Sequence, residues 1–157
     1  MCHYCGCREI PLIKDFIREH EAATDLTGEI ARLLEAGDLA AAGALLPPLA
    51  AELASHWWGE EQGLFRVMRG DPEFAAYIDA LEAEHRGLAE LLAGTDPASP
   101  TDRAALLTAF AELHEHIAKE EDGLFPASLI ALTAADWDAS MAAWQEAHPG
   151  RQPSEPG

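Results

Sequence analysis

Histidine and glutamate recur in two nearly identical strings of the sequence, HWWGEEQGLF at residues 56–65 and HIAKEEDGLF at residues 116–125. In each string a glutamate follows the histidine by four residues, as in His56 and Glu60. An α-helix turns about 100° per residue, so such a pair lies about 40° apart on one face of the helix. Each string therefore points an imidazole and a carboxylate, which are both common metal ligands, into the same space.

The repeat includes two further histidines, each preceded by a glutamate, as Glu19-His20 and Glu84-His85. All four histidines interrupt helix faces that are otherwise apolar. The chain therefore reads as two helical hairpins that carry the same set of polar residues. If the hairpins fold together, four imidazoles and two carboxylates meet at one level of the core. The predicted site consists of His20, His56, Glu60, His85, His116 and Glu120.

Six buried ionisable groups are unfavourable unless they are paired or bind a metal. Two metal ions with mixed nitrogen and oxygen ligands would satisfy them, with Glu60 and Glu120 as bridges between the ions. Such ligands suit iron or manganese, and they also suit zinc. The alternative is a metal-free bundle with buried polar pairs, because a lone histidine on an apolar face is more often a hydrogen-bonded core residue.

The elements that must position these residues are helices. Hydrophobic residues make up 48% of the 157 residues, and they are mainly Ala and Leu, which favour helices. We expect an all-α domain with helices over about 11–37, 48–69, 72–94 and 101–126, because apolar residues recur there at spacings of three and four. Pro47 and Pro48 are expected to break or kink the chain, so the second helix begins near them.

Short connections between four long helices predict an up-down-up-down four-helix bundle. A short fifth helix is expected to end near residue 148, after a capping box at Thr133. The predicted organisation is a Cys-rich segment at 1–10, the bundle at 11–148 and a disordered tail at 149–157.

The three cysteines, Cys2, Cys5 and Cys7, form a C-x-x-C-x-C motif at the N-terminus. Three thiolates with His3 or a partner's ligand could hold zinc or iron. A redox-active or nitric-oxide-reactive thiol cluster is a second interpretation, and a frayed terminus with exposed thiols is a third. The cysteines could also join two chains in a homodimer or dock a protein partner.

The net charge of −18 argues against nucleic acid and against anionic membranes as partners, because both are negatively charged. The N-terminus has no apolar segment typical of a signal peptide, and no run of 18 apolar residues suggests a membrane span. Three clustered cysteines are not a disulfide framework, so we expect a cytoplasmic protein.

Over about residues 11–128 the sequence resembles the hemerythrin-like family, whose members carry the HHE cation-binding domain. The resemblance rests on the six predicted site residues and on the Leu-Phe pair after each string. It implies a four-helix bundle with a non-haem, oxo- or hydroxo-bridged di-iron centre. Oxygen-carrying members have His-x-x-x-His on the third helix, where this chain has Ala89 as the second residue. They also end with His-x-x-x-x-Asp, whereas here Glu120 and Glu121 are both available, and the internal repeat favours Glu120.

The resemblance implies binding of, or reaction with, O2, peroxide or nitric oxide, in a redox or sensor role. A missing histidine leaves an open metal position, which fits catalase- or peroxidase-like activity better than reversible oxygen transport. The alternative is an iron store or regulatory module without turnover. A ferritin-like di-iron bundle is disfavoured, because its Glu-x-x-His motif occurs at a site histidine only as Glu82 and His85.

Several neighbouring residues have less specific expectations. Glu61 and Glu121 are expected to face solvent or to support the ligands. Gly63 and Gly123 suggest a close approach of helices or room for a ligand channel. No role is assigned to His148.

Overall fold

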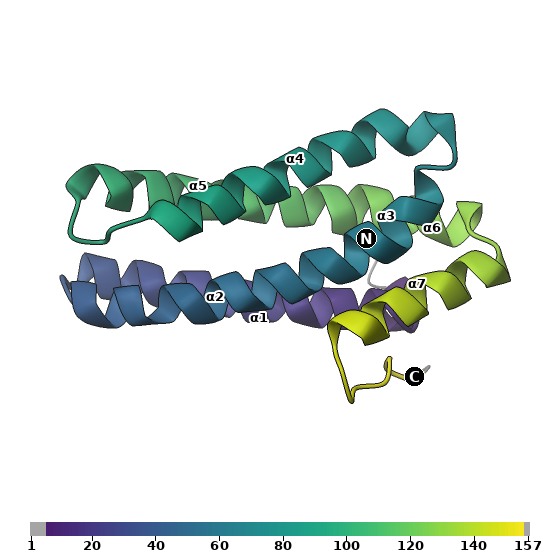
Figure 1. The fold of residues 1–157 in the computed structure, drawn as a ribbon, viewed down its shortest axis with the longest axis horizontal. Coiled ribbons are helices and arrows are strands. Elements are labelled where there is room, and N and C mark those ends of the chain that lie inside the picture. The colour runs from purple at the N-terminus through teal and green to yellow at the C-terminus, as the bar shows by residue number, and fades with distance from the viewer. Residues whose placement is uncertain (1–5, 156–157) are drawn as a thin grey trace.

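The computed structural model describes residues 6–155, and this part of the chain contains helices and no strand. Four long helices lie along one another, α1 (Ile13–Glu35), α2 (Leu39–Gly59), α4 (Pro72–Gly94) and α5 (Pro100–Lys119) (Figure 1). Shorter elements are η1 (Cys7–Glu9), α3 (Phe65–Met68), α6 (Phe125–Ala131) and α7 (Ala134–Ala147). The all-α prediction is confirmed for these residues, and the up-down-up-down order stays a prediction.

The long helices pair as two halves, with α1 beside α2 and α4 beside α5 (Figure 1). Contacts of α1 with α5 and of α2 with α4 join the halves. The final helix, α7, packs against α2 and the segment that follows it. None of the described helices has the length and apolar character needed to cross a membrane.

The helices begin at polar caps that the sequence supplies. Asp38 accepts a hydrogen bond from the backbone N–H of Ala41 at 3.1 Å. Asp71 caps α4 ahead of Pro72, which occupies the first helical position as expected from sequence. The capping box of Thr133 and Asp136 is also confirmed at the start of α7. These local signals set where three of the helices begin.

The expectation that the second helix begins near Pro48 is wrong, since neither Pro47 nor Pro48 ends a helix. Helix α2 begins at Leu39 and runs through both prolines to Gly59. Each proline removes one backbone donor and normally kinks or ends a helix. Here Ala42 and Leu46, in the turns before the prolines, are buried in the core. Tertiary packing therefore outweighs the local preference, and α2 is long enough to pair with α1.

Two short π-helical segments follow the ligand-bearing helices, η2 (Glu60–Leu64) after α2 and η3 (Glu120–Leu124) after α5. Each begins at the first glutamate of the repeated Glu-Glu pair. A π turn holds one more residue than an α turn, which rotates the residues after it relative to those before. The consecutive residues Leu64 and Phe65, at the end of η2 and the start of α3, are both fully buried.

The apolar core is divided by a polar layer. One cluster of buried residues includes Ile30, Leu53 and Leu113, and the other includes Phe16, Leu81 and Phe125. Each of the four predicted histidines lies between members of the two clusters along its helix. The core therefore supplies apolar packing on both sides of the candidate site.

Gly63 lies where η2 meets α7. A Cβ atom at this position would lie 3.0 Å from the carbonyl oxygen of Ser140 and 3.2 Å from the Cβ of Ala143. At Gly123 a Cβ would come within 3.2 Å of the Tyr77 hydroxyl. The close approach expected from the repeated glycines is therefore present at Gly63, where backbone faces backbone.

Substitution of Gly63 by alanine is expected to lower the free energy of unfolding by about 1–3 kcal/mol, because α7 must shift to admit the methyl group. Gly87→Ala is the control, since a Cβ there would meet no atom within 4 Å. It should stabilise α4 by up to about 1 kcal/mol. Urea denaturation measures both, and equal effects of the two substitutions would contradict the close packing of α7.

Candidate metal centre

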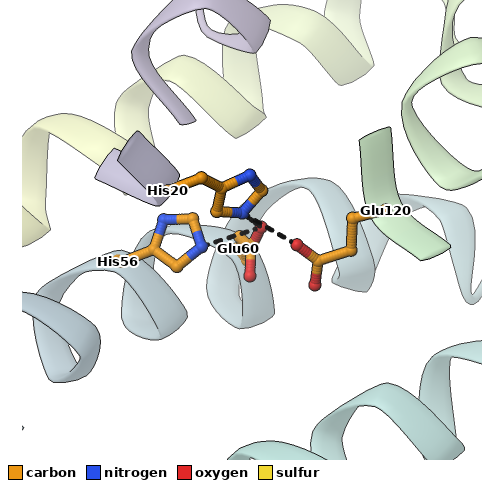
Figure 2. A group of neighbouring side chains, drawn as sticks. All are labelled: His20, His56, Glu60 and Glu120. Carbon is orange, nitrogen blue, oxygen red and sulfur yellow. Dashed lines mark ion pairs between the residues drawn. The ribbon is translucent and has the colours of Figure 1, made fainter. Parts of the chain in front are cut away.

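The structure brings all six predicted bundle residues together. One histidine comes from each long helix, and the four imidazoles are only 2–4% exposed. Glu60 and Glu120 are completely buried between them. Figure 2 shows one side of this arrangement, with His20 of α1, His56 of α2, Glu60 of η2 and Glu120 of η3 converging.

Glu60 faces histidines from both halves of the bundle. Its Oε1 lies 3.3 Å from Nε2 of His56 and 3.9 Å from Nε2 of His20. Its Oε2 lies 3.6 Å from Nε2 of His85. One carboxylate oxygen is thus directed to the first half and the other to the second half.

Glu120 makes the matching arrangement from the opposite side. Its Oε2 lies 3.0 Å from Nε2 of His20, and its Oε1 lies 2.8 Å from Nε2 of His116. Nε2 atoms of His85 and His116 are themselves 2.9 Å apart. Both carboxylates therefore stand between two imidazole pairs, which is the arrangement of bridging ligands.

The donor set fits metal ions. Ligand atoms of His20, His56, Glu60 and Glu120 lie within 4.8 Å of one another, and so do those of His85, His116 and Glu120. In the described part of the chain, no contact to the four carboxylate oxygens has hydrogen-bond geometry. Buried, unsatisfied carboxylates are strongly unfavourable. Cations between the imidazole pairs would remove this penalty.

Metal binding at this site is expected to depend on pH, because the imidazoles and carboxylates of the site shift one another's pKa values. Burial lowers the pKa of His116, but the nearby carboxylates of Glu120, Glu84 and Glu60 together raise it, to about 9. Burial also raises the pKa of Glu120, yet the imidazoles of His116, His20 and His85 together lower it well below its usual range. Without a cation, a proton on His116 would offset the charge of the adjacent Glu120 carboxylate. A divalent cation must displace that proton when it binds.

Each site imidazole also has a second carboxylate on its Nδ1 atom. A carboxylate there holds the Nδ1 proton and leaves Nε2 free for a metal. The four contacts are Glu121 to His20 at 3.0 Å, Glu19 to His56 at 2.8 Å, Glu61 to His85 at 2.8 Å and Glu84 to His116 at 2.7 Å.

These outer carboxylates cross between helices. Glu19 precedes His20 in the sequence but contacts His56, and Glu84 precedes His85 but contacts His116. Glu61 reaches from the first half to the second, and Glu121 reaches back to the first. For Glu61 and Glu121, the sequence predicted either exposure to solvent or support of the ligands, and the contacts show the second. The sequence gave no role to Glu19 and Glu84, although the doubled Glu-His pair was a usable signal.

Groups outside the predicted site hold three of the outer carboxylates. Trp144 Nε1 donates to Glu19 Oε1 at 2.9 Å, and Nε2 of His148 lies 2.6 Å from the same oxygen. Arg8 Nη1 pairs with Glu121 at 2.7 Å, and Lys119 Nζ pairs with Glu84 at 2.5 Å. His148, which had no assigned role, is therefore a buried part of this network.

Position 89 and the N-terminal cysteines, which the sequence singled out, are not part of this cluster of histidines and glutamates. Ala89 is exposed and lines a pocket between α2 and α4, so position 89 adds no ligand to the site. Trp57 lines the same pocket and stacks on His85 with ring centroids 4.7 Å apart. Cys2 and Cys5 lie outside the described residues, and Cys7 begins η1 with partial exposure. A second metal or redox site at the cysteines stays a prediction.

Glu84→Gln is expected to weaken metal binding by about 10–100-fold while leaving the ligands in place, because His116 loses its charged Nδ1 partner. Competition with a chromophoric chelator gives the affinity. Glu90→Gln is the control on the same helix, at an exposed position. Equal affinities of the two variants would show that the Glu84 contact does not support the site.

Comparison with models of protein families matches residues 12–128 to the model described as the hemerythrin HHE cation binding domain. The matched range includes all six predicted bundle ligands and ends before α7. Comparisons with curated proteins and with solved structures give no significant match.

Proposed function

Because the chain belongs to the hemerythrin HHE cation-binding family, we propose that it holds two iron ions between the halves of its bundle. His20 and His56 would bind one ion, and His85 and His116 the other. Glu60 and Glu120 would bridge them. The observation that carries this proposal is that the oxygens of both buried carboxylates face opposite imidazole pairs. The up-down-up-down order of the helices is part of the same proposal.

Iron is the proposed metal because the family resemblance implies it. Imidazole and carboxylate ligands would also accept manganese or zinc, which are the competing occupants. Metal analysis is the direct test of both the identity and the number of the ions.

We propose that the site binds or reacts with O2, peroxide or nitric oxide. A pair of iron ions supplies the electrons and the open coordination that such ligands require. The residues around the site would orient the metal ligands and shield them from water. The outer carboxylates orient the imidazoles, and the two apolar clusters limit access of water. Four imidazoles, with alanine at position 89, favour a redox or sensor role over reversible oxygen transport.

The test is a metal count per chain with a visible spectrum, recorded under air and then with peroxide. About two irons and near-ultraviolet bands from an oxo bridge are expected. Zinc alone, or no metal after expression with ample iron, would contradict the proposal.

Turnover separates an enzyme from a store or sensor. Rapid loss of peroxide that disappears in His116→Ala would establish catalase- or peroxidase-like activity. Stoichiometric binding of ligand without turnover would instead favour a sensor, an iron store or a regulatory module.

A further inference from the structure

A groove of about 680 Å³ runs between α4 and α5 and reaches the candidate metal centre. Its buried lining includes His85 and His116, which belong to the same proposed metal position. Further along, the lining is formed by Leu88, Leu91 and Leu113. The volume is typical of sites for organic ligands and far exceeds what a diatomic molecule needs.

The charges around the groove exclude anions. Its exposed rim carries Glu84, Glu112 and Glu115, with Lys119 as the basic residue of the lining. Lys119 is already paired with Glu84. An anion would also meet the field of a chain with net charge −18. An uncharged molecule with an apolar body matches this lining.

Gly87 is an exposed residue of the groove lining. It lies in the interior of α4, where glycine is unfavourable for the helix. A Cβ at this position would meet no atom within 4 Å, so no close helix contact requires glycine there. Gly87 lines the groove, and a larger side chain would extend into its open space.

Trp57, which lines both this groove and the pocket between α2 and α4, carries a hydrogen-bond donor without an acceptor in the described part of the chain. The donor is the indole N–H, and Trp57 is 8% exposed. A buried tryptophan N–H normally has a partner. Because Trp57 stacks directly on His85, an oxygen atom bound near that imidazole is a suitable acceptor.

We propose that this groove binds an uncharged organic hydroperoxide. Its oxygen atoms would lie beside His85 and His116 and accept a hydrogen bond from Trp57. Its apolar group would lie along Leu88, Leu91 and Leu113. This inference rests on the proposed function for the chemistry at the metal, and it adds the class of substrate.

Binding is tested by calorimetry of the metal-replete protein with 2-phenyl-2-propanol, the unreactive alcohol that corresponds to cumene hydroperoxide. One saturable site is expected. Gly87→Leu should weaken binding by about tenfold or more because the side chain fills the groove. Gly94→Leu is the matched control, since it lies on the same helix, is equally unhindered and does not line the groove. Equal binding by the two variants, or no saturable binding to the wild type, would overturn the proposal.

The Trp57 donor is tested with Trp57→Phe and a pair of ligands. Binding of 2-phenyl-2-propanol should weaken by about fivefold, the usual effect of one lost hydrogen bond. Binding of tert-butylbenzene, in which a methyl group replaces the hydroxyl, should stay nearly unchanged. Equal losses for both ligands would assign Trp57 to packing alone and would contradict the proposed hydrogen bond.

Peroxide assays on the same samples distinguish this inference from the proposed function. With an added reductant to supply the two electrons that convert cumene hydroperoxide into 2-phenyl-2-propanol and water, Gly87→Leu should slow the loss of cumene hydroperoxide more than the loss of hydrogen peroxide. If it slows neither while the wild type consumes both, the groove proposal is wrong and the metal chemistry stands. If the alcohol binds as expected but neither peroxide is consumed, the groove is a binding site and the peroxide chemistry of the proposed function is wrong.

Discussion

Glu120→Gln is expected to abolish binding of the metal pair, with a loss of affinity beyond the roughly 10–100-fold that follows loss of an outer partner. The reason is that the Glu120 oxygens face both halves of the site, at 3.0 Å from His20 and 2.8 Å from His116. Replacement by an amide removes the negative charge from both metal positions together. Elemental analysis after dialysis against a weak chelator measures the loss.

Glu121→Gln is the informative comparison, because the adjacent carboxylate contacts the Nδ1 side of His20 and the guanidinium of Arg8. This variant should keep two ions at saturating metal and lose affinity by about 10–100-fold. Circular dichroism would establish that both variants are folded. The reverse order of affinities would make Glu121 the ligand, as at the corresponding spacing in oxygen-carrying hemerythrins.

Removal of the metal is expected to lower the melting temperature by about 8–16 °C for each tightly bound ion. A ligand present at about 1,000 times its dissociation constant stabilises the folded state by about 4 kcal/mol. For a chain of this size, each kcal/mol shifts the melting temperature by about 2–4 °C. Without metal, the buried carboxylates must rely on protonated imidazoles, whose burial is itself unfavourable. Calorimetric melting before and after chelation measures the change.

Two histidine variants on α5 make this test specific. In His116→Ala, one proposed ligand is lost, so the chelator should have a much smaller effect on melting. In His114→Ala, an exposed histidine two residues earlier is lost, and the full effect of the chelator should remain. A melting temperature that chelation does not change in a protein shown to contain metal would support a bundle whose buried polar pairs need no ion.

The helical fold and the convergence of the six site residues were predictable because both depend on helix periodicity. Spacings of three and four place residues on one face, and the internal repeat matched those faces between the two halves. The course of α2 through Pro47 and Pro48 was not predictable in this way. Local proline chemistry argues for a break, and only the burial of the preceding residues in the assembled core reverses it.

The residues that Glu19 and Glu84 contact could not be predicted from the spacing of residues along the helices either. Sequence distance tells which residues share a helix face, but a contact between helices depends on their relative rotation. The π-helical segments η2 and η3 could not be predicted from the spacing either, because an extra residue in a helical turn depends on how the helix packs. The contact of His148 with Glu19 depends on how α7 packs against the bundle, and the sequence around His148 shows no helical periodicity that would predict it.

Because the site combines residues that lie far apart in the sequence, its ligands are synthesised at different times. Glu121 lies 101 residues after His20, which it contacts, and Glu120 comes one residue earlier. On the ribosome the first hairpin, with His20, His56 and Glu60, is made before either of these carboxylates exists. With the proposed ligands, a nascent chain that ends before Glu120 therefore lacks one bridge and the Nδ1 partner of His20. The complete metal site would form only after α5 and the start of η3 have been synthesised, and a chain that ends earlier would hold an incomplete set of ligands.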